Sequence, residues 1–521
     1  MKSDNIQEIN INSALGGLSV SQYFGTEDSY NSAIGVDLDF PIGSGIRTSG
    51  QLIPTVYEKF SGANIASSPL WISNNPKNTN TYVHCLDGKF ISYDSGLANE
   101  TLIGTPTSGA GNGMNYYNNY IYLMTPTNVS RYGPLNGSPS LANSWWTGLS
   151  LTAPTNTTYP SLRGVTIPNH AGFVHQDNSL YFCDFVNGQG IINKIRTKKV
   201  TVEGDTNDVS IYNALDLPFG YYPVSISNYG LDLAILAIQV TSSSINQGKA
   251  AVFFWETTNV DTFYKQVDLA DPIGTALFNH LGELYAFTGN GVNGVRCSRF
   301  NGDKSFDEEF FIEEGTPPFQ GAVDSMGSRI SFGGWNTYPE SSACVYSYGS
   351  KMSNFLKGLH VPVRSTSTGA NQNVTSLKYV QQSSFVKPQI IAGWGDDSAK
   401  GLDKLSTSAT YNSIWRSKMI NIGKQFTIKE IRIPLGVTLA SNMTLTVKIY
   451  VDDLSNSQTL TTINSTNFTG RKVLFKNPEI TLEGHNNLMI EFKWTGTVQL
   501  PVLFPITITV ELYESEQTTN V

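Results

Sequence analysis

Charged residues are few in this sequence. They make up 15% of the 521 residues, compared with about a quarter in an average soluble domain. The net charge of −8 at pH 7 argues against binding to nucleic acid without sequence preference, which requires a basic face. A local basic run, "KIRTKKV" at residues 194–200, is predicted to be a solvated hairpin. These features argue against sequence-independent binding to nucleic acid, and we expect no sequence-specific nucleic-acid partner either.

Long apolar runs and cysteine pairs are also missing. No stretch approaches the roughly 18 apolar residues of a membrane-spanning helix, and the start, "MKSDNIQEININ", has no apolar core of a signal peptide. No CxxC pair occurs, so neither a zinc site nor a disulfide framework is predicted. We expect a chain made in a reducing compartment, whose cysteines are small core residues: Cys85, Cys183, Cys297 and Cys344.

Glycine, serine, threonine, asparagine and tyrosine take the place of the missing charges. Polar uncharged residues mixed with aromatic ones suit strands and turns better than helices, because branched and ring side chains pack well on a pleated surface. The composition therefore predicts an all-β chain.

Seven prolines, most of them in the phrase Leu-x-x-Pro, recur along the chain at intervals of 45 to 64 residues. Each occurrence is followed by a strand phrase, for example "NNYIYLMT" or "GELYAFTG". A period of about 50 residues with about four short strands per repeat is typical of β-propeller blades, and proline suits the crossover between blades because it cannot donate to a ladder. We predict about seven blades over residues 51–410, within a range of roughly six to eight. The prolines are Pro54, Pro106, Pro154, Pro218, Pro272, Pro317 and Pro362.

The competing interpretation of this repeat is a series of β-sandwiches, with turns every 8 to 12 residues or so. A series of sandwiches would not begin the same order of strand phrases again after each proline, so we favour the propeller.

The two ends of the chain differ from the repeats. From about residue 411 the strands are longer, and Leu445, Val447 and Ile449 alternate with polar residues, which predicts one buried face. We expect a jelly-roll-like β-sandwich over residues 411–521, linked to the propeller by residues 398–413. Residues 1–50 are rich in glycine and serine without a sustained period. They are predicted to form an extended arm that lies across the propeller or a neighbouring subunit.

The acidic run "FDEEFFIEEG" is the strongest catalytic candidate. Paired carboxylates can act as general acid and base on a glycoside. Consecutive strand residues point to opposite faces, however, so we favour a solvated blade edge that discourages edge pairing. The overlapping "FNGDKSFDEEF" lacks the Asp-x-Asp-x-Asp-Gly order of a calcium loop. The acidic residues are Asp307, Glu308, Glu309, Glu313 and Glu314.

Other catalytic signatures are not found. "SYDSGLAN" at residues 92–99 comes nearest to a sialidase-type box but lacks its tryptophan, and no HExxH, Gly-x-Ser-x-Gly or phosphate-loop pattern occurs. We therefore predict no catalytic, cofactor-binding or metal-binding residue, no cofactor and no enzymatic activity. His170 and His175 could share a blade but are expected to be turn and strand residues. The other histidines are His84, His280, His360 and His485.

Two aromatic pairs, Tyr116 with Tyr117 and Trp145 with Trp146, remain as binding candidates. Because adjacent strand residues face opposite ways, we expect one member of each pair to pack in a blade and the other to reach a surface. Surface tyrosine and tryptophan serve sugar stacking or protein interfaces, and we favour an interface.

The N-terminal segment carries a resemblance. "INSALGGLSVSQ" at residues 11–22, followed by "GVDLDFPIGSGIRTSGQLIPT" at residues 35–55, resembles the leader of the tail tubular (nozzle) proteins of short-tailed phages. Those proteins begin with an Asn-x-x-x-Gly-Gly-(Ile/Leu)-Ser phrase and continue into a propeller with inserted β-domains. The layout is also similar to phage virion proteins that join a propeller to a C-terminal sandwich. This chain departs from the nozzle proteins in having no large insertion between blades.

The resemblance implies a structural virion component of a phage tail: a nozzle, tail tip or tail-attached ring. Its partners would be other tail proteins and further copies of itself in a symmetric ring, with a host glycan or receptor as a further partner in attachment. It would reside in the virion tail after assembly in the host cytoplasm. The alternative function is a carbohydrate-binding or receptor-recognising propeller protein, with or without glycoside hydrolase activity.

Overall fold

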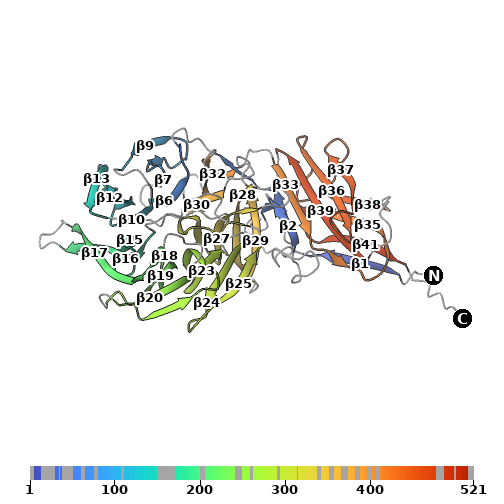
Figure 1. Ribbon diagram of the computed structural model, residues 1–521. Coiled ribbons are helices and arrows are strands. Elements are labelled where there is room, and N and C mark those ends of the chain that lie inside the picture. The colour runs from blue at the N-terminus through green and yellow to red at the C-terminus, as the bar shows by residue number, and fades with distance from the viewer. Residues whose placement is uncertain are drawn as a thin grey trace. The chain divides into compact units, whose positions relative to one another are not determined.

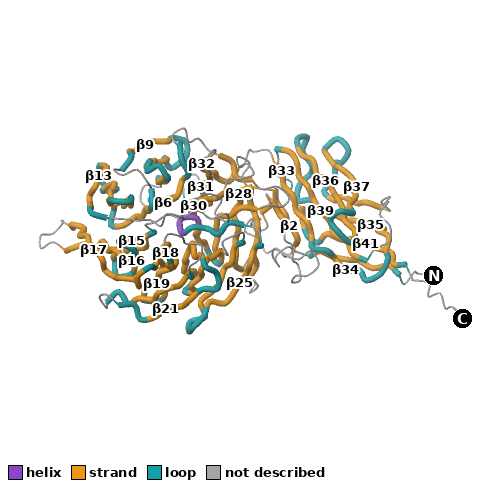
Figure 2. Tube along the Cα trace, viewed as in Figure 1, coloured by secondary structure: helices purple, strands orange, loops and turns teal. Residues whose placement is uncertain are grey.

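The computed structural model confirms an all-β chain (Figures 1 and 2). It describes residues 5–12, 30–34, 36–37, 51–54, 56–59, 65–75, 80–106, 111–149, 171–199, 206–240, 249–258, 262–289, 294–313, 315–336, 342–350, 357–364, 373–381, 388–395, 400–406, 411–476, 486–497, 500 and 502–513. These residues form strands and turns, with one short 3-10 turn, η3 (Gln320–Ala322), among them. Within this part of the chain, no helix has the length and apolar character needed to cross a membrane.

Seven four-stranded sheets follow one another through the described residues between 56 and 406. The first consists of β6 (Pro69–Asn74), β7 (Thr81–Cys85), β8 (Phe90–Tyr93) and β9 (Glu100–Gly104), and the second of β10 (Gly113–Tyr117), β11 (Tyr120–Met124), β12 (Asn128–Gly133) and β13 (Ser140–Thr147). The third contains β14 (Gly172–His175), β15 (Ser179–Val186), β16 (Gln189–Lys199) and β17 (Thr206–Phe219), and the fourth β18 (Tyr221–Tyr229), β19 (Asp232–Gln239), β20 (Ala250–Trp255) and β21 (Lys265–Asp268). The fifth contains β22 (Ile273–His280), β23 (Glu283–Gly289), β24 (Val295–Phe300) and β25 (Phe306–Ile312), and the sixth β26 (Val323–Met326), β27 (Arg329–Asn336), β28 (Ser342–Ser350) and β29 (Lys357–Arg364). The seventh consists of β30 (Asn373–Val380), β31 (Gln389–Gly395), β32 (Lys400–Ser406) and β5 (Val56–Lys59).

The first strands of these sheets form a closed ring. Each contacts the first strand of the next sheet, in the order β6, β10, β14, β18, β22, β26 and β30, and β30 contacts β6 again. A ring of four-stranded sheets joined in this way is a β-propeller, so the predicted propeller is confirmed. The fourth strand of the seventh sheet, β5, precedes the first sheet in sequence, and it therefore ties the start of the repeats to their end.

The strand phrases that mark the repeat are the second strands of the sheets, where burial is greatest. In β19, Leu233 and Ile235 belong to one hydrophobic cluster, whereas Ala234 and Leu236 belong to another. A strand covered on both faces by neighbouring sheets reads as a continuous apolar run. This burial explains why the repeat is visible in the sequence.

The prolines stand at the margins of the sheets. Pro106, Pro272 and Pro317 lie between the last strand of one sheet and the first strand of the next, and Pro218 is the penultimate residue of β17. Pro362 lies within β29, a fourth strand. Pro106, Pro272 and Pro317 therefore match the predicted crossovers, whereas Pro218 and Pro362 lie in fourth strands and Pro54 ends β4 (Gln51–Pro54), a strand of a small three-stranded sheet. Pro154 lies outside the described residues.

A second group of sheets forms around the C-terminal part of the chain. One sheet has the order β1 (Ile6–Ile11), β41 (Ile506–Leu512), β35 (Phe426–Pro434) and β38 (Lys472–Lys476). Another has the order β2 (Tyr30–Ile34), β33 (Tyr411–Ser417), β39 (Asn487–Gly496), β36 (Met443–Val451) and β37 (Ser457–Asn464), with β34 (Ile420–Asn421) paired to β39. A small third sheet joins β3 (Val36–Asp37), β4 (Gln51–Pro54) and β40 (Val502–Leu503).

One hydrophobic core is shared by the two larger C-terminal sheets. Leu445, Val447 and Ile449 of β36 pack in it, as their alternation predicted. Tyr450 of the opposite face is also buried, because its hydroxyl donates to Glu491 at 2.8 Å and accepts from Arg416 at 3.0 Å.

The described part of the predicted arm, residues 1–50, forms strands. β1 and β2 pair with β41 and β33, and β3 and β4 belong to the small sheet with β40. Residues 1–58, 346–364 and 405–521 make up one compact unit, and residues 59–345 and 365–404 make up the other. The predicted link at residues 398–413 contains β32 and the start of β33.

Candidate functional site

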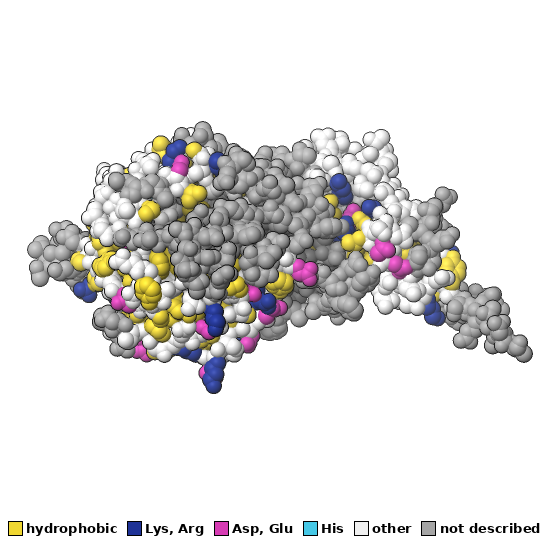
Figure 3. Space-filling view, in the orientation of Figure 1, with side chains coloured by type: hydrophobic (Ala, Val, Ile, Leu, Met, Phe, Trp, Pro, Cys, Tyr) yellow, Lys and Arg dark blue, Asp and Glu magenta, His cyan; other side chains and the backbone are white. Residues whose placement is uncertain are grey.

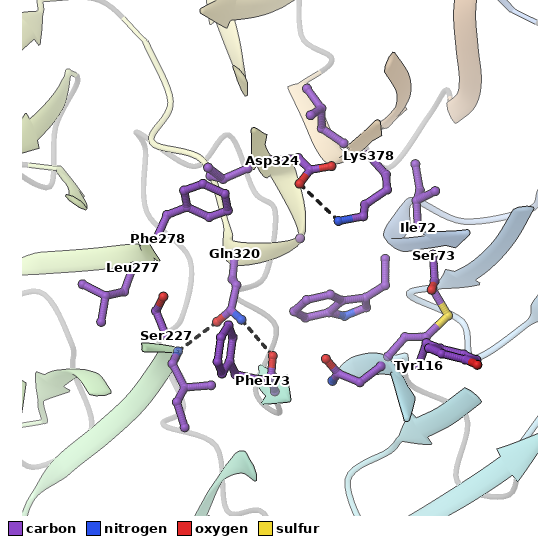
Figure 4. A pocket seen from close by; sticks show the side chains of 18 of the residues that line it. Ile72, Ser73, Tyr116, Phe173, Ser227, Leu277, Phe278, Gln320, Asp324 and Lys378 are labelled. Atoms are coloured by element: carbon purple, nitrogen blue, oxygen red, sulfur yellow. Dashed lines mark hydrogen bonds and ion pairs between the residues drawn. The ribbon is translucent and has the colours of Figure 1, made fainter. Parts of the chain in front are cut away.

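A pocket with a volume of about 540 Å³ lies among the first strands of the propeller sheets (Figure 4). Residues from β6, β10, β14, β18, β22, β26 and β30 line it, because the first strand of each sheet faces the axis of the ring. Aromatic rings and side-chain amides make up much of the lining, namely Trp71, Asn74, Asn115, Tyr116, Phe173, Asn228, Phe278, Asn279 and Tyr379. Rings with amides are suited to holding a neutral, polar ligand.

Gln320 of η3 joins three sheets within this pocket. Its Oε1 accepts hydrogen bonds from Ser225 Oγ at 2.8 Å and from Ile226 N at 2.9 Å, and its Nε2 donates to Gly172 O at 2.9 Å. Ser225 Oγ in turn accepts from Leu277 N of β22 at 2.8 Å. Figure 4 shows the Gln320 side chain between Phe173 and Ser227, with its bonds to Ile226 N and Gly172 O dashed. The amide therefore satisfies backbone groups that the strands leave unpaired.

An ion pair occupies another side of the pocket. Asp324 Oδ1 lies 3.1 Å from Lys378 Nζ (Figure 4), and Asp324 Oδ2 accepts from Tyr379 N at 2.8 Å. The Lys378 side chain is 41% exposed and that of Asp324 13%. The lysine can therefore reach a ligand while the carboxylate holds β26 to β30.

Two donors in the lining are buried without a hydrogen-bonding partner among the described residues: Trp71 Nε1 and Asn115 Nδ2. Buried polar groups normally have partners, and a bound water or a ligand oxygen would satisfy these. Gly172 faces Asn115, and a Cβ added there would lie 2.4 Å from Asn115 Nδ2. Glycine at residue 172 thus makes room for the amide.

The acidic run lies at a sheet edge, as predicted. It forms β25, the fourth strand of the fifth sheet. Glu308 pairs with Arg296, and Glu309 Oε1 lies 2.6 Å from Arg299 Nε. Glu313 is exposed, Asp307 accepts from Ser305 Oγ at 3.0 Å, and Glu314 lies outside the described residues. The loop that resembles a calcium site is a turn in which Asn301 Oδ1 accepts from three successive backbone amides.

The described histidines have separate structural surroundings. His84 is fully buried, and its Nδ1 donates to Gly113 O at 3.2 Å. Burial lowers the pKa of His84 to about 4, so it is neutral at pH 7. His175 Nε2 donates to Leu231 O at 3.0 Å, and His280 lies at the end of β22. His170, the side chain of His360, and His485 lie outside the described residues.

No metal site is found in the part of the chain that the structure describes, where no three His, Cys, Asp or Glu side chains cluster. The four cysteines are buried, which confirms their predicted place in the core. Burial raises the pKa of the Cys85 and Cys183 thiols well above the usual value.

The aromatic pairs behave as predicted in one case only. Tyr117 is buried, whereas Tyr116 is partly exposed and lines the pocket. Trp145 and Trp146 both pack against one cluster, with Trp145 on Tyr122 at 5.3 Å between ring centroids. A register shift in the pairing of β12 with β13 and a positive φ at Ser144 break the strict alternation there.

Sequence reasoning missed Gln320, Asp324, Lys378 and Trp71. The available signal was their common place near the first strand of a repeat, which in a propeller faces the ring axis. Nothing in the local sequence around Gln320 indicates its partners, because Gly172 lies 148 residues away.

No family model and no curated protein matches this chain. Solved structures similar to it include the computationally designed Ika8 protein, at 11% identity over 67% of this chain and 99% of that chain, with a TM-score of 0.36. BBS1N in complex with ARL6DN is 12% identical over 67% of this chain and 96% of that one, with a TM-score of 0.39. The β-propeller domain of Cps50 (Swd1) from Myceliophteria thermophila is 10% identical over 67% and 98%, with a TM-score of 0.40. TM-scores this low carry no inference about function.

Proposed function

We propose that this chain is a structural component of a phage tail, as a nozzle, a tail tip or a tail-attached ring, and that it acts through protein contacts in assembly. In this proposal it is a seven-bladed propeller joined to a jelly-roll-like β-sandwich, and it is not an enzyme. It resides in the virion tail as one copy of a symmetric ring, after assembly in the host cytoplasm.

The observation that carries the proposal is how the leader segment is used. Residues 11–55 carry the resemblance to tail tubular proteins. Of the N-terminal strands β1 to β5, which we call the leader strands, β2, β3 and β4 lie in this range and enter two different sheets. In the pairing of β2 with β33, Tyr30 lies opposite Ser417. The segment that carries the resemblance is thus held in the fold by residues far along the sequence, and this anchoring suits a part that makes contacts in an assembly.

Purified particles test the proposal. We expect the chain in tailed particles banded on a density gradient, at a constant ratio to the capsid protein across the particle fractions, and we expect antibody labelling at the tail in electron micrographs. Absence of the chain from particles that are otherwise complete would refute a virion role. Wild-type turnover of a glycan, abolished by Glu308→Gln or Glu309→Gln, would instead support the hydrolase.

The pocket favours a second candidate, recognition of a neutral carbohydrate. Its rings and amides are the groups that stack on and hydrogen-bond to sugars. Titration with neutral oligosaccharides followed by calorimetry tests this function, with Tyr116→Ala as the variant that removes a ring from the lining. Binding that is equal for wild type and variant, or no binding, would exclude the pocket as a sugar site.

A further inference from the structure

Three neighbouring hairpin tips of the propeller, together with Tyr264 just before β21, expose large apolar side chains. We call this surface the tip patch; it consists of Val174, Leu231, Tyr264 and Leu281, which are 38%, 77%, 53% and 76% exposed. Leu231 is in the β18–β19 turn and Leu281 in the β22–β23 turn, while Val174 lies on β14 close to the β14–β15 turn. Figure 3 shows hydrophobic side chains gathered over the part of the propeller that contains β15, β16, β19 and β20, with acidic side chains near them.

Hydrogen bonds hold the three tips together. His175 Nε2 donates to Leu231 O at 3.0 Å, and Gln176 Nε2 donates to Gly230 O at 3.2 Å. Asn279 Nδ2 donates to Asn228 O at 3.1 Å, which connects the β22–β23 hairpin to the β18–β19 hairpin. The tip patch is therefore a preformed surface rather than a set of independent loops.

Leu281 has an unfavourable backbone conformation for its residue type. It occupies the first position of a two-residue turn with φ +53°, followed by Gly282 with φ +85°. Such turns require positive φ at both positions and favour Asn-Gly, whereas a leucine at positive φ is strained. The chain uses the favoured residues in two equivalent turns, Asn118-Asn119 and Asn187-Gly188.

Burial does not compensate for this strain. Leu97 also has a positive φ, +56°, but its side chain is 2% exposed and packs in a core. The side chain of Leu281 is 76% exposed instead. Strain without a benefit to the fold points to a functional contact.

We propose that the tip patch is a docking surface for a partner protein that presents apolar side chains flanked by basic ones. Each tip carries one carboxylate next to the apolar residues, namely Asp177, Asp232 and Glu283. Asp177 and Glu283 form ion pairs within the chain, at 3.0 Å to Lys194 Nζ and 2.9 Å to Arg299 Nη1. Asp232 accepts from the neutral hydroxyl of Tyr264 at 2.7 Å, a bond that leaves its negative charge in place for a partner. A second copy of this chain would bring like charges together at Asp232, whereas basic side chains on a partner would complement this carboxylate. The proposal rests on the proposed role in tail assembly and names the surface that serves it.

Leu281→Asn separates docking from folding. Asparagine suits the turn better than leucine, so the variant should unfold at the same temperature as wild type or higher. Incorporation of Leu231→Asn/Leu281→Asn into particles should fall about tenfold or more, as expected when central apolar contacts are lost. The matched control is Phe219→Asn. Phe219 is also 77% exposed, but it is the last residue of β17 and lies beside Gly188 of the β15–β16 turn. That turn is at the end of β15 away from the tip patch. The control variant should incorporate normally.

The charge of the partner is tested with Asp232→Lys, which should lower incorporation, whereas Asp268→Lys on β21 should not. Normal incorporation of Leu231→Asn/Leu281→Asn beside wild type would overturn the docking surface while leaving the tail role intact. Absence of wild type from particles would overturn both. Self-association of the purified wild-type chain in sedimentation, abolished by the double substitution, would assign the patch to a second copy and overturn the basic partner.

Discussion

Gln320→Leu should lower the stability of the propeller more than most single changes. The leucine fills similar space but removes the acceptor for Ile226 N and the donor for Gly172 O. Ile226 is fully buried, as is Ser225, whose hydroxyl loses the same acceptor. A buried polar group left without a partner costs about 1–3 kcal/mol.

The expected loss in the free energy of unfolding is about 3–5 kcal/mol, from two backbone groups and one hydroxyl. Water from the adjacent pocket can reach some of these groups, which places the expected value toward the lower end. Urea unfolding followed by circular dichroism measures the total. Hydrogen exchange at the Ile226 and Leu277 amides measures the local effect, because both amides bond directly into the network.

Two variants serve as controls. Gln266→Leu removes an exposed amide of β21 and should change stability by no more than about 0.5 kcal/mol. Gln320→Glu keeps an acceptor for Ile226 N but places a carboxylate oxygen opposite Gly172 O, so it should be destabilised at neutral pH and regain stability where the acid is protonated and can donate. A Gln320→Leu variant as stable as Gln266→Leu would refute the reasoning.

Three further predictions concern other parts of the chain. Deletion of residues 1–12 removes β1 from β41; we expect it to lower the unfolding temperature of the C-terminal unit, and an unchanged unit in limited proteolysis would contradict this. Because the pKa of His84 is about 4 in the folded chain and about 6.5 when unfolded, the unfolded chain binds more protons between these values. Stability should fall as pH drops from about 6.5 to 4, by up to about 3 kcal/mol, and His84→Gln should flatten that slope in urea titrations; an unchanged slope would be contrary evidence. Arg416→Met leaves the buried carboxylate of Glu491 with the Tyr450 hydroxyl but without its ion-pair partner, and should cost about 3–5 kcal/mol. Arg416→Met/Glu491→Met should recover most of that loss in thermal unfolding; equal losses would refute the coupling.

The propeller repeat was predictable because its signal is local. A middle strand such as β19 is covered on both faces, so nearly every residue in it must be apolar, and this pattern returns with each sheet. The edge position of β25 was predictable for the opposite reason, since Asp307 and Glu308 are exposed there. Both inferences need only residues that are close together in sequence.

The leader strands and the pocket were not predictable from local patterns. The outer residues of β1 are exposed, and its pairing with β41 depends on residues at the other end of the sequence. Gln320 bonds to Ile226, 94 residues away, and to Gly172, 148 residues away. A single amide between glycine and phenylalanine carries no sign of either partner. Such features follow from contacts between segments far apart in sequence, which a single sequence does not display directly.

The two closures impose an order on folding. The sheets from β6 to β25 are each complete within a short stretch of chain, so they can form early at a small cost in loop closure. The seventh sheet combines β5 with β30, β31 and β32, and it cannot be complete before residue 406 has been synthesised. The sheet that contains β1 waits still longer, for β41 at residues Ile506–Leu512. β3 can pair with β4 as soon as both are made, whereas β1 and β5 must wait for these distant partners, so the two sheets that they complete close late.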